Sequence, residues 1–134
     1  MVVDGWLDGA MSLNVSASDP EGRPETTVAS LPPKLPDEVT LLDVREEHEW
    51  VAGHAPDALH VPLGQLPDRQ AEVVAAAGSG QLLVTCHLGG RSARATDFLV
   101  SSGVDAVNLA GGMQQWAAAG RPLVSETGAA PHVD

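Results

Sequence analysis

Short apolar runs alternate along this chain with amphipathic segments, and glycine or proline stands at most of the boundaries between them. Near-continuous apolar runs of this length are typical of parallel strands that are buried on both faces of a sheet. The pattern predicts strands at residues 39–44, 58–61, 82–85 and 104–109, with a candidate edge strand at 26–29. The prolines that follow the edge strand exclude a regular helix or a central strand there: Pro32, Pro33 and Pro36.

The segments between the strands predict helices. They cover residues 46–51, 68–77, 93–100 and 113–119, and a glycine stands at or just beyond the end of each. Because strands and helices alternate, we expect an α/β three-layer sandwich, in which helices flank both faces of a mostly parallel central sheet. In such a sheet a ligand binds beyond the carboxyl ends of the strands.

The composition fits one domain and narrows the range of partners. The chain has 134 residues and a formal net charge of −11, which argues against nucleic acid or an anionic membrane surface as a partner. It lacks both a long apolar run and a basic-then-apolar leader, so we expect neither a membrane span nor a signal peptide. A single cysteine permits no internal disulfide, which fits a cytoplasmic location. No cluster of ligating side chains has the spacing of a metal site.

The only cysteine, Cys86, stands between a predicted strand and a predicted helix. Backbone N–H groups at such a junction converge on one point, where they bind anions and stabilise a thiolate, the nucleophilic form of cysteine. Gly89 and Gly90 let the loop bend tightly. Arg91 adds a permanent charge, and Ser92 is a candidate N-cap or first-turn donor. The alternative is a buried structural cysteine, but such a residue has no need of an anion-binding loop.

Acidic residues are absent from the sequence around this loop. None occurs between Val73 and Thr96, whereas Arg91 and Arg94 both lie in that interval. We therefore expect a locally basic site in an acidic protein, and an anionic substrate. The alternative is a chance gap in the acidic residues.

Three groups of short sequence segments follow one another along the chain and together carry a resemblance to a known family. They are LDVRE at 42–46 with EW at 49–50, GHAP at 53–56 and ALHVPL at 58–63; CHLGGRS at 86–92; and LAGGM at 109–113 with Trp116 and AGRP at 119–122. Together they resemble the single-domain form of the rhodanese domain of sulfurtransferases. The resemblance covers residues 26–124, which leaves residues 1–25 as a loosely structured N-terminal tail and 125–134 as a C-terminal tail.

The resemblance implies a mechanism. Cys86 would take sulfane sulfur from thiosulfate or a persulfide donor, become a persulfide, and pass the sulfur to cyanide or a thiol; a protein donor or acceptor is a further option. Neither a metal nor an organic cofactor is implied. The rest of the loop would bind the substrate: His87, Leu88, Gly89, Gly90, Arg91 and Ser92.

The resemblance also ranks the alternatives. The six-residue loop from Cys86 to Arg91 is associated with sulfur transfer. A loop one residue longer is associated with phosphatases and arsenate reductases, which are the less favoured alternative. A sulfur-relay or partner-binding module with little thiosulfate activity stays open, because a carrier uses the same cysteine. His87 stands where relatives often carry a basic residue, which leaves the preferred donor open.

Other residues have two interpretations each. Asp43 and Arg45 are candidate supporting residues: Asp43 either orients the active-site arginine or belongs to a structural ion pair, which we favour. Trp50 and Trp116 are expected to pack in the core or at the pocket rim, and His54 is expected to lie at a turn. Gly111-Gly112 is expected to form a strand-to-helix turn, and the alternative is a place in the active-site wall.

Overall fold

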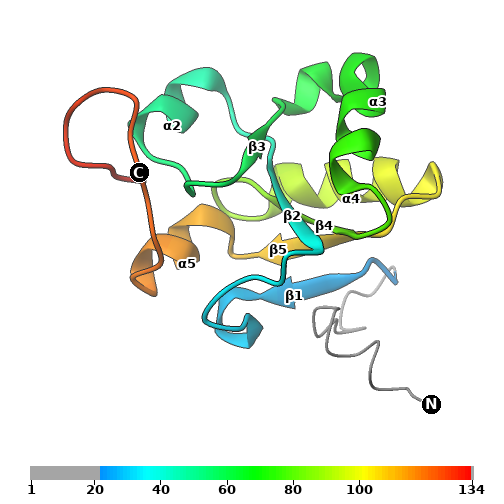
Figure 1. Ribbon diagram of the computed structural model, residues 1–134, viewed down its shortest axis with the longest axis horizontal. Coiled ribbons are helices and arrows are strands. Elements are labelled where there is room, and N and C mark those ends of the chain that lie inside the picture. Colours follow the sequence, from blue (N-terminus) through cyan, green and yellow to red (C-terminus); the bar gives the residue numbers. More distant parts are fainter. Residues whose placement is uncertain (1–21, 134) are drawn as a thin grey trace.

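The computed structural model describes residues 22–133. Their centre is a five-stranded sheet with parallel pairings throughout and the strand order β1-β5-β4-β2-β3 (Figure 1). The strands are β1 (Glu25–Thr27), β2 (Val39–Asp43), β3 (Leu59–His60), β4 (Gln81–Thr85) and β5 (Ala106–Ala110). The helices are α2 (Glu47–Ala52), α3 (Leu66–Ala77), α4 (Gly90–Ser101) and α5 (Gly112–Ala118), with short 3₁₀ helices η1 (Val28–Ser30) and η2 (Leu63–Gln65). The predicted α/β architecture is confirmed.

Several boundaries differ from the prediction. The edge strand begins at Glu25 and passes directly into η1, so the second half of the predicted strand is helical instead of extended. β3 keeps only two residues, because Pro62 follows closely and cannot donate to a ladder. α3 begins at Leu66 rather than at Asp68, since Pro67 fits the first turn of a helix, where its missing N–H has no partner to lose.

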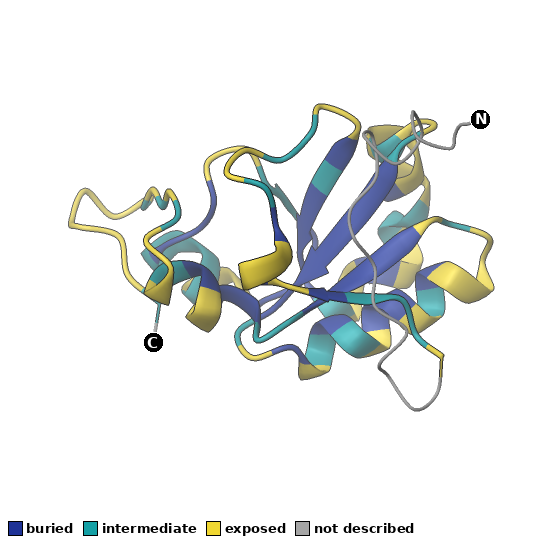
Figure 2. Cartoon of the chain, turned by 90° about the horizontal axis from the view of Figure 1, so that it is seen from below, coloured by how far each residue is buried: buried dark blue, intermediate teal, exposed yellow. Residues whose placement is uncertain are grey.

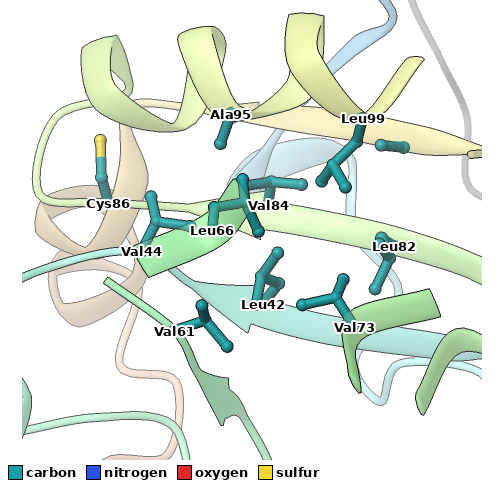
Figure 3. Packing of buried hydrophobic residues seen from close by; sticks show 11 residues of the cluster. Leu42, Val44, Val61, Leu66, Val73, Leu82, Val84, Cys86, Ala95 and Leu99 are labelled. Atoms are coloured by element: carbon teal, nitrogen blue, oxygen red, sulfur yellow. The ribbon is translucent and has the colours of Figure 1, made fainter. Parts of the chain in front are cut away.

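Two apolar clusters hold the layers together, one on each face of the sheet. Neighbouring residues of a strand point to opposite faces, so Leu41 and Leu42 of β2 enter different clusters. Met113 and Trp116 attach α5 to one face. The other face carries α3 and α4 (Figure 3) through Leu42, Val44, Val61, Leu66, Val73, Leu82, Val84, Cys86, Ala95, Leu99 and Ala106. Figure 2 shows the sheet buried between helices whose outer faces are exposed.

The structure describes most of the predicted C-terminal tail but little of the predicted N-terminal tail. Residues 1–21, most of the predicted N-terminal tail, lie outside the described residues, as does Asp134. The described part of the predicted C-terminal tail runs beside α2 rather than away from the body (Figure 1). Its backbone N–H groups donate to carbonyls at the end of that helix, Glu126 to Val51 at 2.8 Å and His132 to Ala52 at 3.0 Å. In the described part of the chain, no helix is long and apolar enough to cross a membrane.

Candidate active site

Cys86 follows the carboxyl end of β4 directly and is 1% exposed. Its Sγ accepts a hydrogen bond from the Gly89 N–H at 3.1 Å, and Ser92 Oγ lies 3.3 Å from it. Gly89 has a φ of 112° and is the N-cap of α4, which therefore starts three residues earlier than predicted. Of the two roles expected for Ser92, the first-turn donor is correct and the N-cap is not, because only glycine takes this left-handed conformation readily.

Opposing effects act on the Cys86 thiol. Burial raises its pKa, because it disfavours the charged thiolate. The hydroxyl of Ser92 and the backbone N–H groups of Ser92, Gly89 and Leu88 lower the pKa and outweigh burial, so that the net pKa lies below the ordinary value. The loop thus favours the thiolate, the form that acts as a nucleophile.

The amino end of α5 forms the outer wall of the loop. The Met113 N–H donates to the Cys86 carbonyl at 2.7 Å, and the Gln114 N–H donates to the His87 carbonyl at 3.0 Å. Gly112 has a φ of 55°, and a Cβ there would overlap both of these carbonyl oxygens. The glycine pair therefore makes the turn and also lets α5 approach the loop. The carbonyls point outward to α5, which leaves the N–H groups of the loop to face Cys86 Sγ.

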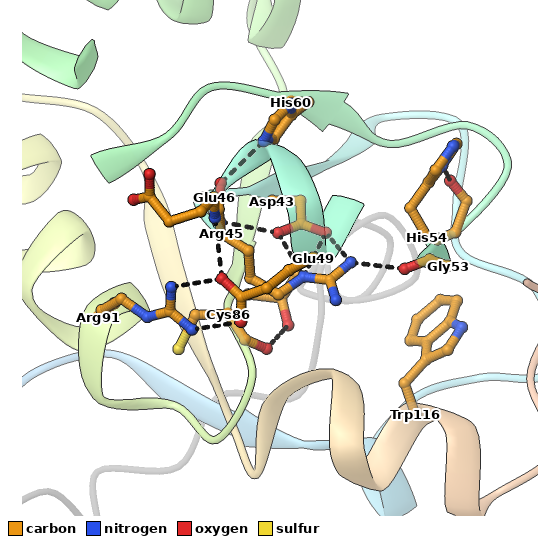
Figure 4. Close-up of polar contacts among 12 residues, drawn as sticks. Asp43, Arg45, Glu46, Glu49, Gly53, His54, His60, Cys86, Arg91 and Trp116 are labelled. Carbon is orange, nitrogen blue, oxygen red and sulfur yellow. Dashed lines mark hydrogen bonds and ion pairs between the residues drawn. The ribbon is translucent and has the colours of Figure 1, made fainter. Parts of the chain in front are cut away.

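Arg91 lies beside Cys86 and is held by Glu49 of α2 (Figure 4). Two parallel hydrogen bonds of 2.8 and 2.9 Å join the guanidinium to the carboxylate. The Arg91 hydrogen bond is the main cause that lowers the pKa of Glu49 to about 2. The expectation of a locally basic loop therefore needs correction: an acidic residue 42 positions away in sequence compensates Arg91. Residues 73–96 contain no acidic residue, but the fold brings Glu49 from α2 into contact with Arg91.

Asp43 pairs with Arg45 and not with Arg91. The Asp43 carboxylate accepts from Arg45 Nε at 3.0 Å and Nη2 at 2.8 Å, and both side chains are buried. Arg45 also donates to the Gly53 carbonyl at 2.8 Å. The geometry matches the structural ion pair favoured from the sequence. It ties the end of β2 to the end of α2 and so fixes the helix that carries Glu49.

A family model for the rhodanese-like domain matches residues 27–119. The chain belongs to the rhodanese-like domain family. A sulfurtransferase of Allochromatium vinosum is 35% identical over 102 residues, which make up 74% of this chain and 92% of that protein. The HTH-type transcriptional regulator Rv0324 of Mycobacterium tuberculosis is 34% identical over 115 residues, or 81% of this chain, and the match spans about half (49%) of the regulator.

A solved structure of the same family has a similar fold. The crystal structure of a rhodanese-related protein from Thermoplasma volcanium has a TM-score of 0.67 and 30% sequence identity to this chain. The match covers 75% of this chain and 96% of that one. The resemblance inferred from the three sequence segments is confirmed at the level of the family.

Other conspicuous side chains of this rhodanese-like domain, Trp50 and two histidines, pack against one another. Trp50 stacks between His54 and His60, with centroid distances of 3.6 and 4.6 Å and nearly parallel rings. His54 Nδ1 lies 2.9 Å from the Ala55 carbonyl, and its Nε2 lies 2.8 Å from Glu126 of the C-terminal segment. Contrary to the prediction, His54 does not lie in a turn: it forms an isolated antiparallel bridge with Val124, and the nearby turn begins at Pro56. The sequence did not suggest its contact with Glu126.

A small cavity beside the loop was not expected from the sequence. It has a volume of about 210 Å³ and is lined by Arg45, His48, Glu49, Ala52, His87, His132 and Val133. His87 Nε2 is buried and has no hydrogen-bond partner among the described residues. Leu88 does not line the cavity and is 58% exposed. Of the predicted loop, His87 thus faces a cavity, while Leu88 faces solvent. No group of three ligating side chains in the described residues is placed to hold a metal ion.

Sequence reasoning missed Glu49, Asn108 and Glu25 as members of this site. Asn108 accepts from Ser92 at 2.6 Å and donates to Glu25 at 2.8 Å. The only available signal for Glu49 was its place in the Glu49-Trp50 segment of the resemblance. Asn108 offered a weaker one, as a polar residue inside an otherwise apolar strand.

Proposed function

We propose that this chain is a sulfurtransferase in which Cys86 carries the transferred sulfur as a persulfide. The observation that carries the proposal is the Cys86 loop, where N–H groups converge on a buried sulfur and lower its pKa. Membership of the rhodanese-like family and relatives that are named sulfurtransferases support it.

The reaction needs two displacements and no external oxidant. In the first, the Cys86 thiolate attacks the outer sulfur of thiosulfate; the S–S bond of the donor breaks, and its electron pair leaves with sulfite. In the second, cyanide or a thiolate attacks the outer sulfur of the persulfide, and the electron pair of that S–S bond returns to Cys86 Sγ. Such a covalent intermediate predicts ping-pong kinetics. The N–H groups of Gly89 and its neighbours would stabilise the terminal charge of the persulfide.

A second candidate is a sulfur-relay module that takes its sulfur from a persulfide rather than from thiosulfate. The bidentate Glu49–Arg91 pair favours this candidate, because the carboxylate offsets the charge that would attract a dianion. A phosphatase or arsenate reductase is less favoured, since the loop from Cys86 to Arg91 has six residues.

Steady-state kinetics test the proposal and separate its two forms. Thiocyanate formation from cyanide is measured with thiosulfate, and in parallel with a low-molecular-weight persulfide as the donor. We expect parallel double-reciprocal lines for at least one donor and no turnover by Cys86→Ser. Activity with the persulfide alone supports the relay module. Turnover by Cys86→Ser with either donor would refute the mechanism.

A further inference from the structure

A chain of hydrogen bonds runs from Cys86 to the edge of the sheet. Ser92 Oγ lies 3.3 Å from Cys86 Sγ and 2.6 Å from Asn108 Oδ1. Asn108 Nδ2 lies 2.8 Å from Glu25 Oε2 and 3.4 Å from the Gly89 carbonyl oxygen. Glu25 and Asn108 are register partners of β1 and β5, so the sheet itself sets their spacing. Asn108 is 1% exposed, which protects the network from water.

The chemistry of these groups fixes the direction of each hydrogen bond. Both partners of Asn108 Nδ2 are oxygen acceptors, a carboxylate and a carbonyl, so the amide must turn its Oδ1 toward Ser92. Asn108 Oδ1 carries no hydrogen, and Ser92 must therefore donate the 2.6 Å bond. A hydroxyl has one hydrogen. While that hydrogen points to Asn108, Ser92 presents only a lone pair to Cys86.

We propose that Asn108, oriented by Glu25, is a positioning residue that competes with Cys86 for the single hydroxyl proton of Ser92. The 2.6 Å contact to Asn108 is short for an O–H···O bond, whereas 3.3 Å is ordinary for a bond to the larger sulfur atom, so the two acceptors share the hydroxyl and Cys86 receives it only part of the time. A thiolate that receives fewer hydrogen bonds is more basic and a stronger nucleophile. The network thus lowers the fraction of Cys86 that is ionised at a given pH and makes the remaining thiolate more nucleophilic. The inference rests on the proposed function only in taking Cys86 as the nucleophile.

Charged groups from other elements also surround the loop, and the test must keep them constant. They are Arg91 on α4, Glu49 on α2 with Glu46 at its N-cap, Asp43 at the end of β2 and Arg45 after it, Glu25 on β1, and the titratable His87 in the loop. Glu49 and Arg91 compensate each other, as do Asp43 and Arg45. Removal of the Glu25 charge would by itself favour the thiolate. Variants at Glu25 are therefore compared at equal charge.

The test is the pH dependence of Cys86 alkylation by iodoacetamide, which reports on one thiol because the chain has one cysteine. Asn108→Leu keeps the branched shape of the side chain and removes the acceptor. We expect it to release the Ser92 hydroxyl and to move the alkylation midpoint to lower pH by about one unit. In a Ser92→Ala background the same substitution should leave the midpoint unchanged, since no hydroxyl remains to be released.

Glu25 supplies a second test if Asn108→Leu fails to fold. Glu25→Gln retains an acceptor for Asn108, whereas Glu25→Ala does not, and both remove the charge. We expect the alkylation midpoint of Glu25→Ala to lie at lower pH than that of Glu25→Gln, because Asn108 is then no longer oriented toward Ser92. In a Ser92→Ala background the two Glu25 variants should have the same midpoint. Equal midpoints for the two Glu25 variants, or an effect of Asn108→Leu that persists in Ser92→Ala, would overturn the inference. Alkylation does not depend on sulfur transfer, so failure of the proposed function is a separate outcome.

Discussion

Glu49→Gln tests whether the Arg91 pair stabilises the fold around the loop. The pKa of Glu49 falls from its ordinary 4.5 to about 2, chiefly through the hydrogen bond from Arg91. A fall of about 2.5 units corresponds to at most about 3.4 kcal/mol of stability. The Glu49 side chain is 21% exposed and its partner 31%. Solvent screening of such a pair reduces the expected loss in Glu49→Gln to roughly 1 kcal/mol.

The contribution of Glu49 should depend on pH with a definite sign. Since the folded-state pKa lies below the unfolded value, the stabilisation is complete above the unfolded pKa of 4.5 and is lost as the pH falls through about 2. The difference between wild type and Glu49→Gln should therefore be constant near neutral pH. It should shrink to less than half near about pH 3.

Urea unfolding at neutral and acidic pH measures this difference. Glu47→Gln is the matched control, because Glu47 lies on the same helix, is exposed, and forms no ion pair among the described residues. It should unfold at the wild-type midpoint. If Glu49→Gln were as stable as Glu47→Gln at neutral pH, the pair would not stabilise the fold. If its deficit were unchanged in acid, the charge of Glu49 would not be the cause.

Three further predictions concern the loop and its support. Gly112→Ala should lose at least about 2 kcal/mol in urea unfolding through backbone overlap, whereas Gly120→Ala, with positive φ but open space, should lose about 1 kcal/mol; equal losses would contradict the close approach of α5. Alkylation of Cys86 in the folded protein should be half-maximal below the ordinary thiol value of about 8.5 and return to it in urea; no difference would contradict the lowered pKa. Arg45→Met should cost about 3–5 kcal/mol by leaving Asp43 buried and unpaired, and the double substitution Asp43→Leu/Arg45→Met should recover most of it; no recovery would argue against the ion pair as the cause.

The fold and the centre of the site were predictable because their signals are local. An apolar run followed by Cys86, two glycines and Arg91 specifies a strand, a tight loop and a helix within a few residues. The same holds for Gly111-Gly112, where positive φ values accompany a strand-to-helix turn. Family resemblance added the order of these segments. Local signals of this kind depend little on the rest of the chain.

The partners of the loop were not predictable, because they come from distant segments. Glu49 lies 42 positions from Arg91, and Glu25 lies 83 positions from Asn108. Their contacts depend on sheet register and on the direction of α2, which a charge count along the sequence does not contain. Residues 125–134 were likewise assigned as a tail, because they lie beyond the segments that carry the resemblance. Its backbone hydrogen bonds to α2 require only N–H groups, which every segment offers.

Intact mass spectrometry tests the central claim, that Cys86 accepts sulfur, most directly. The protein is treated with thiosulfate or with a low-molecular-weight persulfide, and Cys86→Ser is treated in parallel. The account predicts a gain of roughly 32 Da, one sulfur atom, in the wild type alone, and its loss on addition of cyanide. The same gain in Cys86→Ser, or no gain in the wild type with either donor, would contradict the account.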